Sequence, residues 1–505
     1  MHRYLRATVM SLAVVSALAC NLLSATGTPT ALSTATEAAA LQSPLPSVSP
    51  SPLTPTETPV PTQPPEPSPS PAPLTPSDTP APASLNATGP FVVFKGQSGI
   101  WIANPDGSFP TQVSEIESQG DLRRAISPAG DRLALVVRSD AGLDLVVVKI
   151  PGGETETIAH LIGLTRDEEI ADPLSPKAFA AYAIRDYASV AWQPGDGRRL
   201  AFVGAMNGPT ADLYLYDTET GEIAQLTDGP SQAVLPDWSP DGQTILHYGV
   251  SWVPPFGGAI GGANQLDGVW AVQVADGTLI ELPKPEGIVP KFAGWQDDSH
   301  YLTYDSDDEC FSQNLRSVDA ASGEATPLMD HSFYYAIARS PENGALLFSS
   351  APGCANSLGE GVFLLLPGQT TPSKLLDKRA YEIDWLPESH VFDAYPEALL
   401  SSDGQTRYDP PVYDASFQPA ISKEGYQAWE VIQNQQGRVV VRAGEGEWQN
   451  VLDGFVKQVI WDPVEGRTLL IALDDGSLYA ASIPDFTPRL MGNLGGIVDQ
   501  AIWLP

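Results

Sequence analysis

One recurring motif constrains the fold of this chain. A large apolar residue followed two positions later by proline, or by an aspartate in its place, occurs nine times in 505 residues. The copies begin at Ile126, Trp192, Trp238, Trp295, Arg339, Trp385, Phe417, Trp461 and Trp503, of which Arg339 is polar. A repeat of roughly 40–50 residues predicts an architecture built from one supersecondary unit.

Each repeat contains two predicted β-hairpins. In the copy that starts at Trp238, the turn dipeptide Asp241-Gly242 precedes a β-rich run, and a later run leads into Asp276-Gly277 and another strand. Asp-Gly between short β-rich runs is typical of hairpin turns. We therefore expect a four-stranded antiparallel meander per repeat, with strands A to D in chain order. Radial packing of such sheets is a β-propeller.

The ends of the chain predict how the ring closes. The last copy, from Ile502 to Pro505, supplies a strand A with no partners after it. The strands it lacks are present at 91–94, 99–102 and 111–113. We expect the C-terminal strand to complete the N-terminal blade and so to remove the open sheet edge.

The number of blades is less well determined by the motif. Nine copies imply nine blades, but the step from Trp385 to Phe417 is only 417 − 385 = 32 residues, which suggests a merged copy. The prediction is an all-β propeller of about eight four-stranded blades, with seven or nine as alternatives. The motif tryptophans lie on the innermost strand beside a turn and are expected to wedge between blades rather than to stack on a ligand.

The Trp-Ser-Pro-Asp-Gly sequence at 238–242 and the strand after it resemble the TolB-type propeller repeat. That repeat also occurs in the propellers of prolyl oligopeptidase and dipeptidyl peptidase relatives. The resemblance covers the chain from about residue 90 to the end, with departures at Trp295-Gln296-Asp297 and at Arg339. It implies a propeller that binds partners or gates access. It implies no catalytic residue, because the chemistry of those peptidases resides in a separate hydrolase domain.

The first 20 residues predict export. A basic start and an apolar run from Ala7 to Ala19 precede Cys20, as in a signal peptide, and the run is too short to span a membrane. Ala17-Leu18-Ala19-Cys20 resembles a bacterial lipobox in which Cys20 is lipidated, although ordinary signal-peptidase cleavage also fits. We expect an exported lipoprotein on the cell surface or in the periplasm, with the membrane contacted only through this anchor.

Residues 21–89 predict a tether between the anchor and the propeller domain at 90–505. The segment is rich in Ser, Thr, Ala and Pro, a composition that favours extended polyproline II over a packed core. The net charge of −34 comes from 27 Lys and Arg against 61 Asp and Glu, and the propeller carries nearly all of it. A field of this sign disfavours nucleic acid as a partner. We expect a monomer.

Two further cysteines occupy matching places in neighbouring repeats. Cys310 follows Leu302 by 310 − 302 = 8 residues, and Cys354 follows Leu346 by 354 − 346 = 8. Both therefore fall in the loop between strands B and C of adjacent blades. Because an exported protein meets an oxidising environment, we predict a disulfide between them.

Long connections indicate a functional surface. The B–C loop at 250–262 is long, and the connection from strand D to the next strand A at 161–189 is longer, with a predicted helix at 175–185. B–C and D–A connections emerge on one face of a propeller, where rigid scaffolds commonly carry binding loops. The candidate ligand-binding residues there are Trp252 and Phe256, as aromatic anchors, and Asp305, Asp307, Asp308 and Glu309, as a cation or basic-group site.

The sequence favours binding over catalysis. It contains no Gly-x-Ser-x-Gly elbow, no phosphate-binding loop and no His-Glu-x-x-His motif. We predict no catalytic, metal-binding or cofactor-binding residue, and a non-catalytic module for an unidentified protein, peptide or glycan. Two alternatives stay open: an exported hydrolase or lyase of peptides or carbohydrates with carboxylates at the rim, and a purely structural envelope module.

Overall fold

The computed structural model describes residues 85–86, 89–96, 99–105, 108–114, 121–186, 189–253, 263–282, 290–307, 311–334, 337–353, 356–463, 465–493 and 498–504, within the compact unit Pro82–Pro505. Leu85 packs against the core of the first blade, and the Asn86 backbone N donates to Asn104 Oδ1 at 2.8 Å. Contacts with the propeller thus begin just inside the segment predicted as tether. Residues 1–84, including Cys20, lie outside the described residues.

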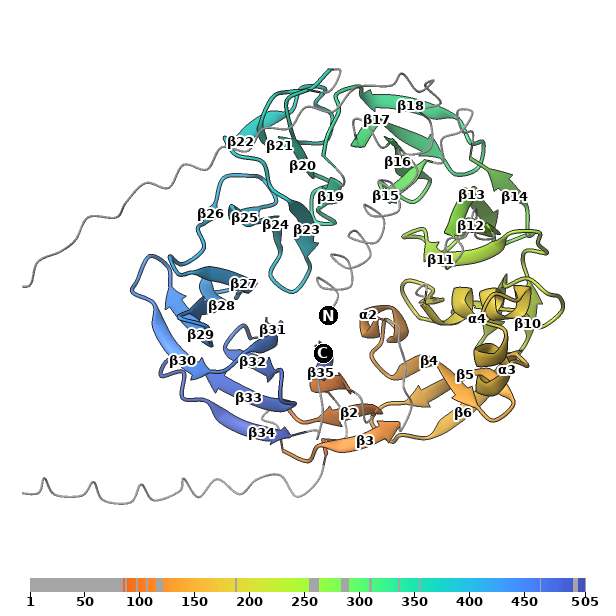
Figure 1. Cartoon of the computed structure of the whole chain (residues 1–505), viewed down its shortest axis with the longest axis horizontal. Helices are drawn as coiled ribbons and strands as arrows, with labels where there is room; N and C mark the ends of the chain where they lie inside the picture. The colour runs from red at the N-terminus through yellow and green to blue at the C-terminus, as the bar shows by residue number, and fades with distance from the viewer. Residues whose placement is uncertain are drawn as a thin grey trace, which may run out of the picture. The chain divides into compact units, whose positions relative to one another are not determined.

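The described strands form nine antiparallel sheets arranged as a β-propeller (Figure 1). Eight sheets have four strands. The remaining sheet has three, and an isolated bridge between Ile126 and Leu133 stands in the place of its innermost strand. The all-β propeller is confirmed. The number of blades is nine, the largest of the predicted alternatives, rather than about eight.

The first three blades follow, each from the channel outward. Blade 1 consists of β35 (Val498–Leu504), β1 (Phe91–Gly96), β2 (Gly99–Ala103) and β3 (Thr111–Ser114). Blade 2 consists of β4 (Arg132–Ser139), β5 (Gly142–Lys149) and β6 (Thr155–Ile162), preceded by helix α2 (Leu122–Ala125). Blade 3 consists of β7 (Val190–Trp192), β8 (Arg199–Gly204), β9 (Asp212–Asp217) and β10 (Ile223–Gln225). Helices α3 (Arg166–Ala171) and α4 (Pro176–Asp186) connect blades 2 and 3.

The next three blades follow the same order. Blade 4 consists of β11 (Gln232–Trp238), β12 (Thr244–Val253), β13 (Ala263–Gln273) and β14 (Leu279–Glu281). Blade 5 consists of β15 (Lys291–Trp295), β16 (His300–Asp307), β17 (Phe311–Asp319) and β18 (Ala325–Met329). Blade 6 consists of β19 (Ile337–Arg339), β20 (Leu346–Ser350), β21 (Gly361–Leu365) and β22 (Ser373–Leu376).

The last three blades return to the start of the ring. Blade 7 consists of β23 (Glu382–Leu386), β24 (Val391–Tyr395), β25 (Ala398–Ser401) and β26 (Arg407–Tyr408). Blade 8 consists of β27 (Ala415–Ile421), β28 (Tyr426–Gln433), β29 (Gln436–Ala443) and β30 (Gln449–Asp453). Blade 9 consists of β31 (Val456–Trp461), β32 (Thr468–Leu473), β33 (Ser477–Ser482) and β34 (Arg489–Asn493).

The ring closes as the chain ends predicted. The C-terminal strand β35 pairs antiparallel with β1, with Val92 opposite Trp503 and Phe94 opposite Ala501. Strand β1 is fully buried, so the closing seam is apolar on both faces. Because the last strand is bonded into the first blade, the ring has no unpaired edge at the junction of its ends.

The motif builds the turn between strands A and B. In the copy at 238–242, the Ser239 hydroxyl accepts hydrogen bonds from the backbone N of Gln243 (3.2 Å) and of Thr244 (2.9 Å), and it donates to Asp241 at 2.6 Å. Gly242 closes the turn with φ +68°, a backbone conformation that glycine adopts without strain. The serine, the aspartate and the glycine of the motif are thus explained by one turn.

The motif tryptophans link neighbouring blades, as predicted. Trp192 Nε1 donates to the carbonyl of Ala125 at 2.8 Å, Trp238 Nε1 to that of Ala191 at 2.9 Å, and Trp461 Nε1 to that of Ala420 at 3.2 Å. All three tryptophans are buried. In the first two pairs the acceptor stands one residue before the motif residue of the preceding blade, which is Ile126 or Trp192.

The same rule corrects the position of one copy. Since Ala420 is the acceptor in blade 8, the motif residue of that blade is Ile421, at the end of β27, and not Phe417. Ser422 then forms the turn, where its hydroxyl accepts from the backbone N of Tyr426 at 3.0 Å. The spacing from Trp385 becomes 421 − 385 = 36 residues, and the short step that suggested a merged copy disappears.

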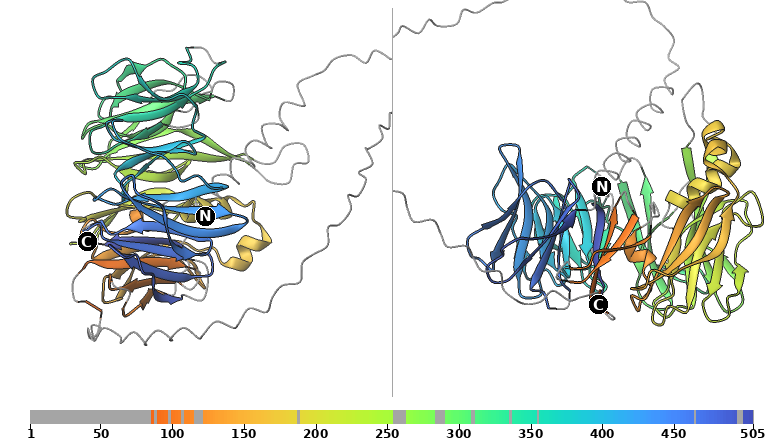
Figure 2. Two further views of the ribbon diagram at one scale, coloured as in Figure 1. Left: turned by 90° about the vertical axis from the view of Figure 1, so that its left-hand side faces the viewer. Right: turned by 90° about the horizontal axis from the view of Figure 1, so that it is seen from below.

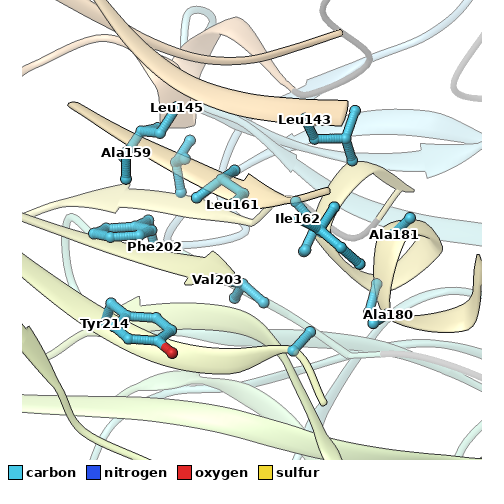
Figure 3. Close-up of a cluster of buried hydrophobic side chains, with 14 of the residues drawn as sticks. Leu143, Leu145, Ala159, Leu161, Ile162, Ala180, Ala181, Phe202, Val203 and Tyr214 are labelled. Carbon is cyan, nitrogen blue, oxygen red and sulfur yellow. The ribbon is translucent and has the colours of Figure 1, made fainter. Parts of the chain in front are cut away.

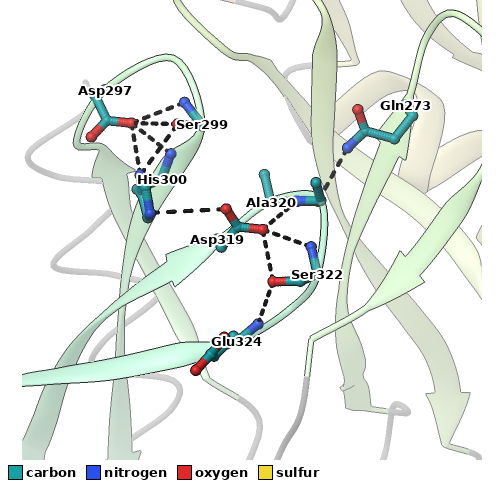
Figure 4. Close-up of polar contacts among 9 residues, drawn as sticks. Gln273, Asp297, Ser299, His300, Asp319, Ala320, Ser322 and Glu324 are labelled. Carbon is teal, nitrogen blue, oxygen red and sulfur yellow. Dashed lines mark hydrogen bonds and ion pairs between the residues drawn. The ribbon is translucent and has the colours of Figure 1, made fainter.

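The two faces of the ring carry different connections. We call the side with the A–B and C–D turns the turn face, and the side with the B–C and D–A connections the loop face. On the turn face of blade 5, Asp297 Oδ1 accepts from the backbone N of His300 at 2.8 Å, and Asp319 from that of Ser322 at 2.7 Å (Figure 4). Gln273 joins this blade to blade 4 through the carbonyl of Ala320.

The loop face bears the helical connection. In the side views of Figure 2, α3 and α4 project beyond the strands on one side of the ring. The sequence predicted α4 at 175–185, and the structure has it at Pro176–Asp186, whereas α3 was not predicted. No helix among the described residues is long and apolar enough to span a membrane.

Candidate functional site

Helix α4 is anchored to the ring by its apolar side. Phe179, Ala180, Ala183 and Ile184 are buried, in one cluster with side chains of blades 2 and 3 that include Leu161. Figure 3 shows Ala180 and Ala181 of this helix beside Ile162 at the end of β6 and Val203 of β8. The helix therefore forms a fixed wall of the loop face rather than a loosely attached connection.

Helix α3 begins with a capping box. The Thr165 hydroxyl accepts from the backbone N of Glu168 at 3.3 Å, and the Glu168 carboxylate accepts from the backbone N of Thr165 at 2.9 Å. This reciprocal pair satisfies two backbone donors at the helix start. The cap fixes where α3 begins and so where the side chains of its first turn lie.

A cleft of about 380 Å³ opens between blade 2 and these helices. Its lining comes from the ends of β4 and β5, from α3 and from the end of α4, and consists of Val136, Arg138, Leu143, Arg166, Glu169, Ile170, Pro173 and Arg185. We call it the arginine cleft. Gly142 makes it possible, because a Cβ at this position would lie 1.9 Å from the Ile162 carbonyl oxygen. The tight approach there brings Leu143 to the wall of the cleft.

Two of the three arginines in the cleft share one carboxylate. Arg138 Nη2 lies 2.5 Å from Glu169 Oε2, and Arg185 Nη1 lies 2.8 Å from Glu169 Oε1. Burial acts to raise the pKa of Glu169, but the hydrogen bonds and charges of Arg185 and Arg138 outweigh it and hold that pKa below its usual value. Glu169 is therefore ionised at neutral pH, and it ties β4 to both helices.

The third arginine is available for a ligand. Arg166 is exposed, and its side chain has no hydrogen-bond or ion-pair partner among the residues that the structure describes. Three guanidinium groups against one carboxylate leave the lining with an excess of positive charge. This is unusual in a chain whose net charge is −34. The arginine cleft can therefore attract an anionic group.

A second cleft, of about 340 Å³, opens on the loop face between blades 6 and 7. It is lined by Ala351, Pro352, Glu360, Lys378, Arg379, Tyr381 and Glu397. The guanidinium of Arg379 lies 4.8 Å from the ring centroid of Tyr334 and 5.5 Å from that of Tyr381, an arrangement that favours cation–π attraction. The Tyr381 side chain is 59% exposed, so an aromatic surface faces solvent here.

Of the six predicted ligand-binding residues, only Asp305 has a described side chain. It is buried, and its carboxylate pairs with Arg316 and accepts from Asn314 Nδ2 at 3.0 Å. The predicted partner of this carboxylate, a basic group, is thus present, but it belongs to the same blade. Asp308, Glu309 and Phe256 lie outside the described residues, as do the side chains of Asp307 and Trp252. Their predicted role in binding is untested.

The strand bounds confirm where the two cysteines fall, and no more than that. Cys310 lies between β16 and β17 and Cys354 between β20 and β21, so both belong to B–C loops of neighbouring blades, 5 and 6. Both residues lie outside the described part of the chain. The disulfide stays a prediction.

The central channel is crossed by α2 at its turn-face end. Arg123 of this helix bonds Glu388, after β23 of blade 7, at 2.6 Å. Arg124 bonds the carbonyl of Pro236 in blade 4 and lies 3.8 Å from Asp237. Figure 1 shows α2 at the inner edge of the ring. These contacts brace three blades and narrow the channel on the side away from the clefts.

A group of catalytic residue types on the turn face does not have catalytic geometry. Ser299 Oγ lies 3.3 Å from His300 Nδ1, and Asp297 Oδ1 lies 3.0 Å from the same nitrogen, while His300 Nε2 faces Asp319 at 3.9 Å. A nucleophile and its orienting carboxylate must bind opposite nitrogens of the imidazole. The described residues also contain no group of three or more His, Cys, Asp or Glu that could hold a metal ion.

Sequence reasoning missed Arg138, Arg166 and Arg185. Two of them lie in the long connection at 161–189 that was singled out, so its length did point to them. Arg138 comes from the end of β4, about 30 residues earlier in the chain, and no spacing rule connects it with a helix of the next connection. The ion pairs with Glu169 exist only because the blade and the helices pack together.

Comparison with known proteins adds little beyond the fold. No family model matches the chain. A stretch of 55 residues is 51% identical to the uncharacterised peptidase YuxL of Bacillus subtilis (strain 168), and it covers 11% of this chain and 8% of that protein. The chain thus matches only a small part of that relative's length.

Several solved structures resemble the propeller weakly. An oligogalacturonate lyase in complex with manganese is 15% identical, with 57% of this chain and 87% of that chain covered and a TM-score of 0.34. Dipeptidyl peptidase 4 of Porphyromonas gingivalis is 10% identical, with 75% and 62% covered and a TM-score of 0.46. TolB of Acinetobacter baumannii is 13% identical, with 74% and 82% covered and a TM-score of 0.26. Likeness at this level leaves the function to be argued from the geometry of this chain.

Proposed function

We propose that the protein is an exported, envelope-anchored binding module whose β-propeller holds a protein, peptide or glycan ligand on its loop face. The observation that carries this proposal is the concentration of irregular features on that face. The α3–α4 connection, the arginine cleft and the second cleft all open there. Binding loops on a rigid scaffold are a common design in proteins.

Exposed apolar side chains support the same face. Of the ten exposed large hydrophobic residues in the described part of the chain, Ile170, Leu174 and Tyr182 lie in the helical connection. Tyr381 lines the second cleft. Large apolar side chains in solvent next to unpaired charge are typical of interaction sites.

The anchor and the tether belong to the proposal as well. Lipidation at Cys20 would fix the protein to a membrane, and the Pro-rich segment at 21–89 would hold the propeller away from it. A propeller displayed on an extended spacer can reach ligands in a cell wall or beyond the membrane surface. Export and lipidation are proposals that rest on residues 1–20.

Paired charge neutralisations on the two faces test the proposal. The exported chain, residues 21–505, is applied to an array of envelope-derived peptides and glycans, beside Arg166→Ala/Lys378→Ala on the loop face and Lys149→Ala/Arg467→Ala on the turn face. All four side chains are exposed, so both variants are expected to fold. We expect the loop-face variant to lose most binding and the turn-face variant to retain it. Equal losses in both would contradict the proposal.

The same samples separate binding from catalysis. Each bound peptide or glycan is incubated with the chain and analysed by mass spectrometry for cleavage products. Intact ligand after prolonged incubation supports a binding module. Turnover that is abolished by Glu360→Gln, at the edge of the second cleft, would establish the hydrolase or lyase alternative instead.

A further inference from the structure

We infer that the arginine cleft binds the carboxylate end of a peptide whose last side chain is aliphatic. This inference rests on the proposed binding function of the loop face and names its ligand. Three features of the cleft match three parts of such a peptide: the free guanidinium of Arg166, the shared carboxylate of Glu169, and an apolar wall.

The positive charge fits a carboxylate. A guanidinium presents its N–H groups as a planar fork, which matches a carboxylate in a two-point hydrogen bond. Arg166 lines the cleft and has no such partner among the described residues, while Arg138 and Arg185 stand behind Glu169. The nearest acidic side chains of α3 other than Glu169 are Asp167 and Glu168, and Glu168 is turned to the Thr165 cap.

Glu169 fits the peptide backbone. An ionised carboxylate offers about four lone-pair positions, of which Arg138 and Arg185 use two. A free position can accept the amide N–H of the terminal residue. The negative charge of Glu169 also disfavours a doubly charged phosphate relative to a singly charged carboxylate, because like charges repel in a partly buried site.

The apolar wall fits an aliphatic side chain. Val136, Leu143, Ile170 and Pro173 line the cleft, and Ile170 is 68% exposed. Covering this surface with an aliphatic group is favourable by about 25 cal/mol per Å² of apolar area removed from water. An acidic sugar would place hydroxyls against these side chains and leave them without hydrogen bonds. The volume of about 380 Å³ is large enough for one terminal residue.

Saturation-transfer NMR with a small probe tests the inference. The probe is N-acetyl-Gly-Gly-Leu as the free acid, with its C-terminal amide as the matched ligand, and the protein is the exported chain, residues 21–505. We expect saturation of the leucine methyl signals by the acid and about tenfold weaker binding of the amide, because the charge-assisted hydrogen bond is lost.

Variants of exposed arginines provide the control. Arg166→Ala is expected to weaken binding of the acid about tenfold, and Arg166→Lys to restore part of it, since lysine keeps the charge and loses the fork. Arg467→Ala removes an equally exposed arginine from the turn face and is expected to change nothing. Circular dichroism of each variant confirms that the fold is intact.

Three outcomes would overturn the inference: equal binding of acid and amide, an unchanged affinity in Arg166→Ala, or a stronger Arg166-dependent affinity for galacturonic acid or inorganic phosphate than for the tripeptide. If the peptide and glycan array still distinguishes the loop-face variant from the turn-face variant, the binding function survives and only this ligand assignment fails. If the array distinguishes neither variant, both fail.

Discussion

The turn face and the loop face of this ring are built by different kinds of sequence. On the turn face, short turns repeat from blade to blade, and side chains such as Ser239 and Asp319 satisfy the backbone within each turn. On the loop face, connections differ from blade to blade, and the contacts of Glu169 join a strand to two helices. Repetition maintains the scaffold, and variation at the other face provides binding surfaces.

The difference also separates stability from binding. Residues of the motif should affect unfolding and leave ligand affinity unchanged, because they lie in the seams between blades and in the turns. Exposed residues of the clefts should do the reverse. Each prediction below can break this division or make it sharper.

Trp461→Ala should have the largest effect on stability. The indole is 1% exposed and donates to the Ala420 carbonyl in the neighbouring blade. Removing a buried tryptophan typically costs about 3–5 kcal/mol in the free energy of unfolding. Chemical denaturation measures it, with Trp385→Ala, at the matching place in blade 7 but only half-buried, as the milder comparison. A similar loss in both variants would contradict the role of the seam.

Glu430 should make stability depend on pH. Burial raises its pKa to about 7, although its carboxylate accepts from the backbone N of Val456 in the next blade at 2.9 Å. A pKa raised above the unfolded value of 4.5 means that its contribution is fully present below pH 4.5 and is lost as pH rises through about 7. The loss amounts to up to about 3 kcal/mol.

Glu430→Gln provides the control for this pH dependence. The amide oxygen can still accept the hydrogen bond from Val456, and it does not ionise. We expect the free energy of unfolding of the variant to change less between pH 5 and pH 8.5 than that of the unmodified chain. Parallel pH profiles of the two proteins would show that Glu430 titrates normally.

Ser239→Ala should have a moderate effect confined to stability. Its hydroxyl accepts from two backbone N–H groups of the turn, at Gln243 and Thr244. Loss of these bonds should cost about 1–2 kcal/mol. Thermal unfolding measures the cost, and the array measurement should be unchanged. Weakened binding in this variant would break the division between the two faces.

Thr165→Ala should have the smallest effect, and it should be local. Loss of the capping box costs about 1 kcal/mol at the start of α3. Hydrogen exchange of the amides at 166–171 should accelerate while the blades are unaffected. Faster exchange throughout the ring would mean that α3 is part of the cooperative core rather than an addition to it.

The sequence predicted much of the fold and little of the site, for a physical reason. Turn and seam interactions are local or recur at a fixed spacing, so Trp238-Ser239-Pro240-Asp241-Gly242 reports them directly. Blade 8 was misaligned at Phe417 because Ile421 and Ser422 lack the tryptophan and the proline that mark the other copies. The hydrogen bond from Trp461 identified the correct position.

The arginine cleft could not be predicted in the same way. It needs Arg138 from blade 2 and Glu169 and Arg185 from the connection that follows it. These residues meet only after β4, α3 and α4 have packed together. Asp305 illustrates the reverse error, since an aspartate in an acidic run suggested an exposed site, and its carboxylate is buried against Arg316.

Hydrogen exchange with and without the strongest binder from the array tests the central claim most directly. The account predicts protection of loop-face segments, above all 136–143 and 165–186, with no change at the turns 239–244 and 297–300. Protection of those turns, with the loop-face segments exchanging as before, would contradict it.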